Sequence, residues 1–307
     1  MKKTLFFILG IIGSLNLFAQ EKNDEQEITN IEYNLALLEK IRISANLIPG
    51  QKPDEIRYIK FAESPRTLAQ TIEGGDGSSY IQARTAYQIM FSKEWVMVDA
   101  GMDREVHDFF GAGLQQPYFQ SANDSLQQAL KKAKEIIITH EHGDHVSGVI
   151  RTLYYKEVAP KTIFTKQMAN TLINSPQMPQ IQLKKEQLKD YNVVDFQDIL
   201  PVSPGIVLIK APGHTPGEIM VYVQLKSGKE YLLAGDVSWS YKGIEEKRQK
   251  PQNQIKRIGE DEVKIQFQLD WLNELTKKDI QIIVSHDDII QPKLVQKQIL
   301  KKGLILK

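Results

Sequence analysis

Short runs of apolar residues, many of them β-branched, recur along the chain between polar segments that contain glycine, proline or asparagine. Such runs predict buried strands, whereas apolar residues that recur every three or four positions predict amphipathic helices. The two alternate through most of the chain, an order typical of an α/β protein with helices packed outside its sheets. The expected strands are 56–61, 79–91, 95–98, 135–139, 162–165, 205–211, 219–225, 231–233 and 280–284, and the expected helices lie near 28–41 and at 124–134 and 263–277.

The N-terminal end of the chain follows a different pattern. Lys2 and Lys3 precede an apolar run that ends at residue 18, and the chain turns polar after Ala19. This layout is typical of a secretory signal peptide, and the run is short for an uncleaved membrane anchor, which is the alternative. We therefore expect cleavage near Ala19 and Gln20, a periplasmic or secreted protein, and no stable membrane anchor afterwards. The expected organisation is a signal peptide at 1–19, an N-terminal helical and linker segment at 20–55 and one main domain at 56–307.

Composition narrows the choice of partners and of chemistry. Lys and Arg number 39 against 38 Asp and Glu, so no net field favours nucleic acid, and we expect a small-molecule substrate. The balance indicates nothing about oligomeric state. The chain has no cysteine, which excludes thiolate metal ligands and a cysteine nucleophile. Histidine and carboxylate side chains are left to hold any metal.

The most informative motif follows the predicted strand 135–139 and has the pattern His-x-His-x-Asp-His. In an extended chain His140 and His142 point to the same side, and a turn at Gly143 brings Asp144 and His145 toward a second point nearby. The spacing therefore suits two metal ions, each taking part of the motif.

Three more candidate ligands follow other predicted strands, and a metal needs them because one loop seldom closes its coordination shell. His214 lies in a Pro-Gly-His-Thr-Pro-Gly turn, Asp236 follows Ala-Gly, and His286 follows Val-Ser. Any one of these histidines alone is more often a structural or surface residue, but their joint placement favours a metal site. His107 lies outside every motif and is expected on the surface. The charge-rich stretches 184–190 and 245–250 are expected to be solvated faces.

Together with Val-Asp-Ala-Gly at 98–101, these segments resemble the five motifs of the metallo-β-lactamase superfamily, over about residues 56–291. The resemblance implies an αββα four-layer sandwich, in the α/β class, with the site at one edge of its two sheets. It also implies two zinc ions, with iron or manganese as alternatives, and between them a water that ionises near neutral pH and attacks the substrate. The implied ligands are His140, His142 and His214 for one ion, Asp144, His145 and His286 for the other, and Asp236 as the bridge.

Two nearby acids keep two interpretations each. Asp99 is either a partner that orients a ligand, as the resemblance implies, or a turn residue at a strand end. Asp287, next to His286, either steadies that ligand or caps a turn.

The resemblance implies a metallo-hydrolase, and the signal-like N-terminal sequence implies that it is exported. A bridging carboxylate such as Asp236 is similar to that of lactonases, glyoxalase II-like thioesterases and phosphotriesterase-like lactonases, so we favour cleavage of an ester or lactone bond. Export weakens the glyoxalase II interpretation, whose substrate is cytosolic. A β-lactam or thioester hydrolase of the same fold, and a non-catalytic metal-binding module, remain the alternatives.

The segment after the bridging carboxylate departs from the best-known lactonases. They carry a tyrosine three residues after it, whereas this chain has Trp239 there and Tyr241 two positions further on. We expect both at the rim of the pocket, where Trp239 is either a hydrogen-bond donor to a developing oxyanion or an aromatic residue packed against the sheet. The predicted catalytic residues are Asp144, which would also orient the attacking hydroxide, Asp236, Trp239 and Tyr241.

Overall fold

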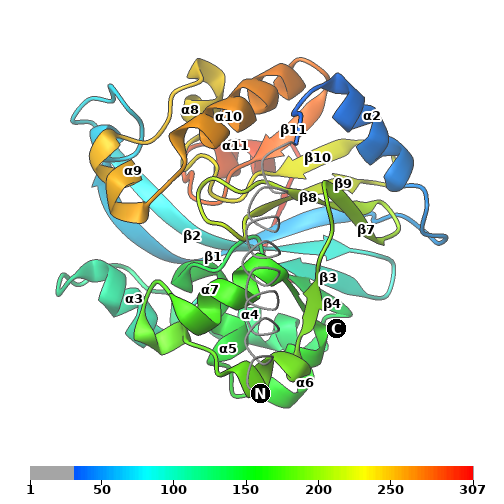
Figure 1. The fold of residues 1–307 in the computed structure, drawn as a ribbon, viewed down its shortest axis with the longest axis horizontal. Helices are drawn as coiled ribbons and strands as arrows, with labels where there is room; N and C mark the ends of the chain where they lie inside the picture. The colour runs from blue at the N-terminus through cyan, green and yellow to red at the C-terminus, as the bar shows by residue number, and fades with distance from the viewer. Residues whose placement is uncertain (1–30, 307) are drawn as a thin grey trace, which may run out of the picture. The chain divides into compact units, whose positions relative to one another are not determined.

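Two β-sheets lie face to face between two layers of helices (Figure 1). The computed structural model describes residues 31–306, of which those from Tyr33 onward form one unit. The larger sheet has the order β12-β1-β2-β3-β4-β5-β6 and the smaller one the order β11-β10-β9-β8-β7. Their bounds are β1 Glu55–Thr67, β2 Ser79–Met90, β3 Trp95–Val98, β4 Glu135–Ile137, β5 Thr162–Thr165, β6 Asn192–Val194, β7 Ile199–Ser203, β8 Ile206–Lys210, β9 Ile219–Gln224, β10 Glu230–Leu233, β11 Ile280–Ile283 and β12 Lys301–Lys302.

Helices cover the outer face of each sheet. In Figure 1, α2, α8 and α10 lie over the smaller sheet, and α4 to α7 lie over the larger one. No helix in residues 31–306 has the length and apolar character that a bilayer span requires. The helix bounds are α2 Leu35–Ser44, α3 Arg104–Gly111, α4 Gln120–Lys132, α5 Gly143–Ile150, α6 Tyr155–Val158, α7 Lys166–Asn174, α8 Tyr241–Glu246, α9 Gln252–Ile258, α10 Glu262–Thr276 and α11 Ile290–Gln296.

The expected α/β sandwich is confirmed, and each expected strand is present; β3 and β5 have the expected bounds, and the other strands have shifted ends. The largest shift is at β1, which continues to Thr67 because it pairs with β2 along its whole length, across an irregularity between Lys60 and Ala62. Strand β3 is buried at every position, as expected of a strand covered on both faces. The hairpin of β9 and β10 is also confirmed.

The N-terminal helix is shorter than its sequence pattern suggested. It begins after Asn34, whose side chain accepts a hydrogen bond from the Leu37 amide, and it buries Leu38 and Ile41. Arg42 at its end pairs with Glu230 on β10 at 2.6 Å, so the helix packs within the same unit as the sheets. The expected signal peptide and its cleavage site lie outside the described residues, and the boundary at residue 56 stays a prediction.

One edge of the sandwich collects the ends of five strands. Parallel strands β3 and β4 end beside each other, as do β10 and β11. The loop after β8 leads into β9, whose first amide, that of Ile219, donates to the carbonyl of Thr139 in the loop after β4. Strand ends brought to one edge place their following residues close together. The segments that carry the predicted ligands follow these strands.

Candidate metal centre

The seven predicted ligands lie in one buried cluster at this edge. Their ligand atoms form three overlapping groups, and within each group the atoms lie within 4.8 Å of one another. Both predicted triads are among these groups, so the side chains lie together in space as expected. The binding of metal stays a prediction. The groups are His140, His142 and His214; His140, His145 and Asp236; and Asp144, His145 and His286.

Asp236 lies between the two triads. Its Oδ2 is 3.0 Å from Nε2 of His286 and 3.5 Å from Nε2 of His214, and its Oδ1 is 3.5 Å from Nε2 of His145. The preceding Gly235 has φ +56, and a Cβ there would lie 2.4 Å from Oε1 of Glu218. Glycine is therefore needed for the turn that aims this carboxylate between the triads.

Hydrogen bonds at Nδ1 fix which nitrogen of three rings faces the cluster. Nδ1 of His145 is 2.8 Å from a carboxylate oxygen of Asp99, and Nδ1 of His286 is 2.6 Å from a backbone carbonyl of β2. Nδ1 of His214 contacts the carboxylate of Glu260. Because an ionised carboxylate and a carbonyl only accept hydrogen bonds, Nδ1 of each ring carries the proton. The Nε2 lone pairs therefore point into the cluster, as second partners arrange for metal ligands.

His140 has the same orientation through a hydroxyl group. Thr139 Oγ1 donates to Asp99 at 2.9 Å, so it is free to accept from Nδ1 of His140 at 3.1 Å. Nε2 of His140 and Oδ1 of Asp236 are buried and have no hydrogen-bond partner in residues 31–306. Moreover, Nε2 of His145 lies 3.3 Å from Nε2 of His286, so both ring nitrogens face the same space. These residues fit metal cations, which would satisfy the converging acceptors.

Electrostatics at the cluster also favour cations. Burial, together with the neighbouring imidazole rings, holds the pKa of His140 and His142 well below the usual range, so both rings are neutral, as a metal ligand must be. Burial also acts to lower the pKa of His145, but the carboxylates of Asp99, Asp144 and Asp236 outweigh it and raise that pKa. The negative potential that favours a proton at His145 equally favours a metal ion.

A buried arginine controls Asp144, and no motif in the sequence indicated it. Arg84 on β2 forms an ion pair with Asp144 Oδ2, and both side chains are almost fully buried. Burial acts to raise the pKa of Asp144, but the guanidinium group and the neighbouring imidazoles hold it well below the usual range. Asp144 Oδ2 is 3.4 Å from Nε2 of both His145 and His286, so the ionised oxygen faces the second triad.

Two buried glutamates hold the loops that carry the ligands. Glu141 accepts hydrogen bonds from Thr215 Oγ1 at 2.8 Å and from the Gly217 amide at 3.3 Å, which fixes the loop of His214. Glu218 accepts a hydrogen bond from the Asp236 amide at 2.6 Å. Burial, and to a smaller extent the negative charge of Asp236, raises the pKa of Glu218 well above its usual value. Glu141 lies within the sequence motif, between His140 and His142, but its position there did not indicate this role.

A buried ion pair supports His214 from behind. Lys250 Nζ lies 2.7 Å from Oε1 of Glu260, which contacts Nδ1 of His214, and it also donates to the Asp236 carbonyl at 2.6 Å. The expectation that 245–250 is a solvated face is therefore wrong at Lys250, which is 2% exposed. A lysine becomes buried only where a carboxylate and carbonyl oxygens replace its water, and these partners are distant in the sequence.

Of the two aromatic residues predicted at the rim, the structure brings only Trp239 to the cluster. Its indole N–H donates to Oδ2 of Asp236 at 2.8 Å, and its side chain is buried. The N–H therefore positions a predicted ligand rather than facing an open oxyanion site. Tyr241 begins α8, its amide donates to Asp287, and it is not part of the pocket lining described below.

The remaining sequence expectations resolve into clear roles. Asp99 accepts hydrogen bonds from the Thr139 amide and from His145, which favours the ligand-orienting interpretation. Asp287 caps a turn by accepting from the amides at 289 and 290. The expectation of a surface His107 is wrong, because α3 turns that ring into the core, where Nε2 lies 3.2 Å from the Gln116 carbonyl.

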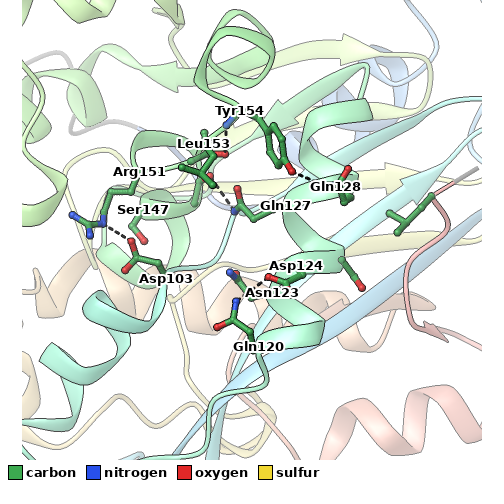
Figure 2. Close-up of a pocket in the computed structure, with 14 residues that line it drawn as sticks. Asp103, Gln120, Asn123, Asp124, Gln127, Gln128, Ser147, Arg151, Leu153 and Tyr154 are labelled. Carbon is green, nitrogen blue, oxygen red and sulfur yellow. Dashed lines mark hydrogen bonds and ion pairs between the residues drawn. The ribbon is translucent and has the colours of Figure 1, made fainter.

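A pocket of about 240 Å³ opens onto the cluster. A second hollow of about 470 Å³, between α4 and α5, is shown in Figure 2; its lining includes Asp103, Asn123, Gln127 and Arg151 but no histidine. The chemistry described above therefore belongs to the smaller pocket. Its lining is Arg66, Gln70, Gln82, Arg84, Phe110, His142, Asp144, Gln177, His214, Asp236, Trp239, Gln254, Arg257 and Ile258.

Comparison with known proteins gives a family match and structural neighbours. Residues 84–270 match the model of the metallo-beta-lactamase superfamily, whereas comparison with curated protein sequences gives no match. A quorum-quenching N-acyl homoserine lactone lactonase aligns with a TM-score of 0.62 at 16% identity, over 80% of this chain and 97% of the other. An N-acyl homoserine lactone hydrolase with N-hexanoyl-L-homoserine bound at its catalytic metal center gives a TM-score of 0.62 at 17% identity, over 79% and 96%. A dizinc quorum-quenching lactonase with a bound product gives 0.55 at 16% identity, over 76% and 88%.

Proposed function

We propose, since the chain belongs to the metallo-β-lactamase superfamily, that it is a metal-dependent hydrolase that cleaves an ester or lactone bond with two zinc ions. The observation that carries this proposal is the convergence of imidazole lone pairs on Asp236. Three rings are fixed by acceptors at Nδ1, and Nε2 of His140 and Oδ1 of Asp236 are buried with no hydrogen-bond partner among the described residues. A merely structural cluster would leave these acceptors unsatisfied at a cost of about 1–3 kcal/mol each.

The ligand roles follow the two triads. His140, His142 and His214 would hold one ion, Asp144, His145 and His286 the other, and Asp236 lies where it would bridge them. Metal ions held there supply Lewis acidity toward an acyl carbonyl and favour ionisation of a water molecule near neutral pH.

The chain's own side chains then orient the reaction. Arg84 keeps Asp144 ionised and fixed, so the Asp144 carboxylate can accept a hydrogen bond from the attacking water and hold it toward the carbonyl. Trp239 holds Asp236 by its indole N–H, and Lys250 and Glu260 hold His214. Phe110 and Ile258 are apolar side chains in the pocket lining that an acyl chain could contact.

The choice of an ester or lactone rests on the bridging position of Asp236 and on the likeness to lactonases. Trp239 occupies the position at which the best-known lactonases have a tyrosine. We therefore expect a substrate whose leaving group departs without a proton from a tyrosine phenol. An indole N–H can donate a hydrogen bond but does not release its proton. We further propose that the protein acts outside the cytoplasm, on the strength of the signal-like N-terminal sequence.

Metal analysis combined with a substrate panel tests the proposal. Protein stripped with a chelator and reloaded should bind about two zinc ions per chain, because seven ligand groups exceed the needs of one tetrahedral ion. Loaded protein should hydrolyse aryl esters and lactones, with cephalosporins, thioesters and phosphodiesters as comparison substrates. A stoichiometry of one, with no gain in turnover on adding zinc, would contradict the two-metal proposal, and loaded protein without any turnover would favour a binding module.

A further inference from the structure

Three arginines line the pocket beside the metal cluster. Arg66 comes from the end of β1, Arg84 from β2 and Arg257 from α9, so three separate elements bring guanidinium groups to one cavity of about 240 Å³. The acids in the same lining are Asp144 and Asp236. Asp236 faces the imidazole rings, and Asp144 faces Arg84 and the second triad.

Two of these arginines have no carboxylate partner in the described part of the chain. Arg84 is paired with Asp144, but Arg66 donates only to its neighbour's carbonyl at 3.3 Å, and Arg257 donates only to Gln254 Oε1 at 2.8 Å and 3.0 Å. Glu260 is the acid whose charge reaches Arg257, but it is already paired with Lys250. Arg66 and Arg257 therefore present charge to the pocket without an internal counter-ion.

The guanidinium groups in this lining repel one another. Arg66 is half-buried and Arg257 is exposed, and desolvation followed by repulsion from Arg84 lowers the pKa of each. Other surface arginines of the chain do have acid partners; Arg151, for example, pairs with Asp103 and Glu105. An anion bound between the guanidinium groups would relieve this repulsion and accept their hydrogen bonds.

We infer that the pocket takes substrates with a second, anionic group away from the bond to be cleaved, and that Arg66 and Arg257 bind that group. The shared chemistry is a carboxylate or a phosphate, and amide groups of Gln70 and Gln254 line the same wall. An uncharged lactone would leave both guanidinium groups without a partner. This inference rests on the proposed function and names a substrate class within it.

A pair of esters isolates the charge. Mono(4-nitrophenyl) glutarate carries a free carboxylate, and its methyl ester has the same scissile bond and leaving group without the charge. The quantity to compare is the ratio of kcat/KM for the acid to that for the methyl ester, which cancels losses common to both. We expect the ratio to fall about tenfold in Arg66→Gln or Arg257→Gln, and further in the double variant, as for loss of a charge-assisted hydrogen bond. Arg151→Gln, which removes the same charge in the hollow of Figure 2, should leave the ratio unchanged.

Binding to metal-free protein gives a readout that does not depend on turnover. Glutarate and inorganic phosphate, titrated separately by calorimetry, distinguish a carboxylate from a phosphate as the preferred anion. The inference is supported if the affinity for glutarate or for phosphate falls at least tenfold in the double variant but is unchanged in Arg151→Gln. Equal ester ratios in the wild type and the double variant, with unchanged anion binding, would overturn it. If neither ester is hydrolysed by zinc-loaded protein, the proposed function fails instead, and the anion titration still decides the inference.

Discussion

Replacing Lys250 by methionine tests whether the support behind His214 is a true buried ion pair. Lys250 and Glu260 have side chains that are 1% and 0% exposed, and Lys250 also donates to the carbonyls of Asp236 and Val237. Lys250→Met keeps most of the side-chain volume but leaves the Glu260 carboxylate buried without its cation. Removing one partner of a buried pair costs about 3–5 kcal/mol, so we expect a loss of that size in the free energy of unfolding.

The assay is urea unfolding of metal-free protein, followed by tryptophan fluorescence, so that zinc binding does not contribute. Lys242→Met is the matched control, because Lys242 is exposed and its Glu246 partner lies at 3.7 Å; we expect a loss below about 1 kcal/mol. The double variant Lys250→Met with Glu260→Gln should recover part of the loss, since no unpaired charge is left. If Lys250→Met unfolds within about 1 kcal/mol of the wild type, the pair does not stabilise the fold.

The same pair predicts a pH dependence with a definite sign. Burial acts to raise the pKa of Glu260, but Lys250 and His214 outweigh it and hold the pKa below its usual value. A carboxylate whose folded pKa is depressed contributes stability above its unfolded pKa, near 4.3, and loses it as the pH falls through the folded value. The stability difference between wild type and Glu260→Gln should therefore be constant near neutral pH and shrink below about pH 4. A difference that instead grows on acidification would refute this reasoning.

Three further predictions concern the site and the N-terminus. Asp236→Ala should abolish ester turnover while far-ultraviolet circular dichroism stays native, because Asp236 faces both triads; near-normal kinetics would remove it from the site. Trp239→Phe should lower kcat roughly tenfold, since Asp236 loses a hydrogen-bond donor, whereas Tyr241→Phe should change kinetics little; equal effects of the two would contradict these roles. Intact mass of the protein from its native host should give a chain starting near Gln20, and retention of residues 1–19 would disprove cleavage.

The clustering of the candidate metal ligands could be predicted from the sequence because each follows a strand that the local pattern reveals. Apolar runs mark the strands, and the residues after parallel neighbours meet at one edge whatever the rest of the fold does. The resemblance of the motifs to the family also implied how the ligands divide into two triads, and both triads are found as groups in space. The fold class followed from the same alternation of strands and helices.

The supporting residues could not be predicted in this way, because their partners are far apart in the sequence. Arg84 precedes Asp144 by 60 residues and Glu260 follows His214 by 46, and neither lies in a motif. A buried lysine such as Lys250 looks the same as a solvated one until its carboxylate is in place. His107 was misassigned because histidine is ambiguous between surface and core, and only the packing of α3 decides.

Asp99 bears on any attempt to make this protein more heat-resistant. Its backbone has φ +65, a region that glycine enters freely and that other residues enter at a cost. Glycine would relieve that cost, but it would leave the buried Thr139 amide and Nδ1 of His145 without their shared carboxylate, and these two losses outweigh the strain. Aspartate at position 99 therefore opposes the local backbone preference, and a replacement chosen from backbone geometry alone would weaken the fold and the site together.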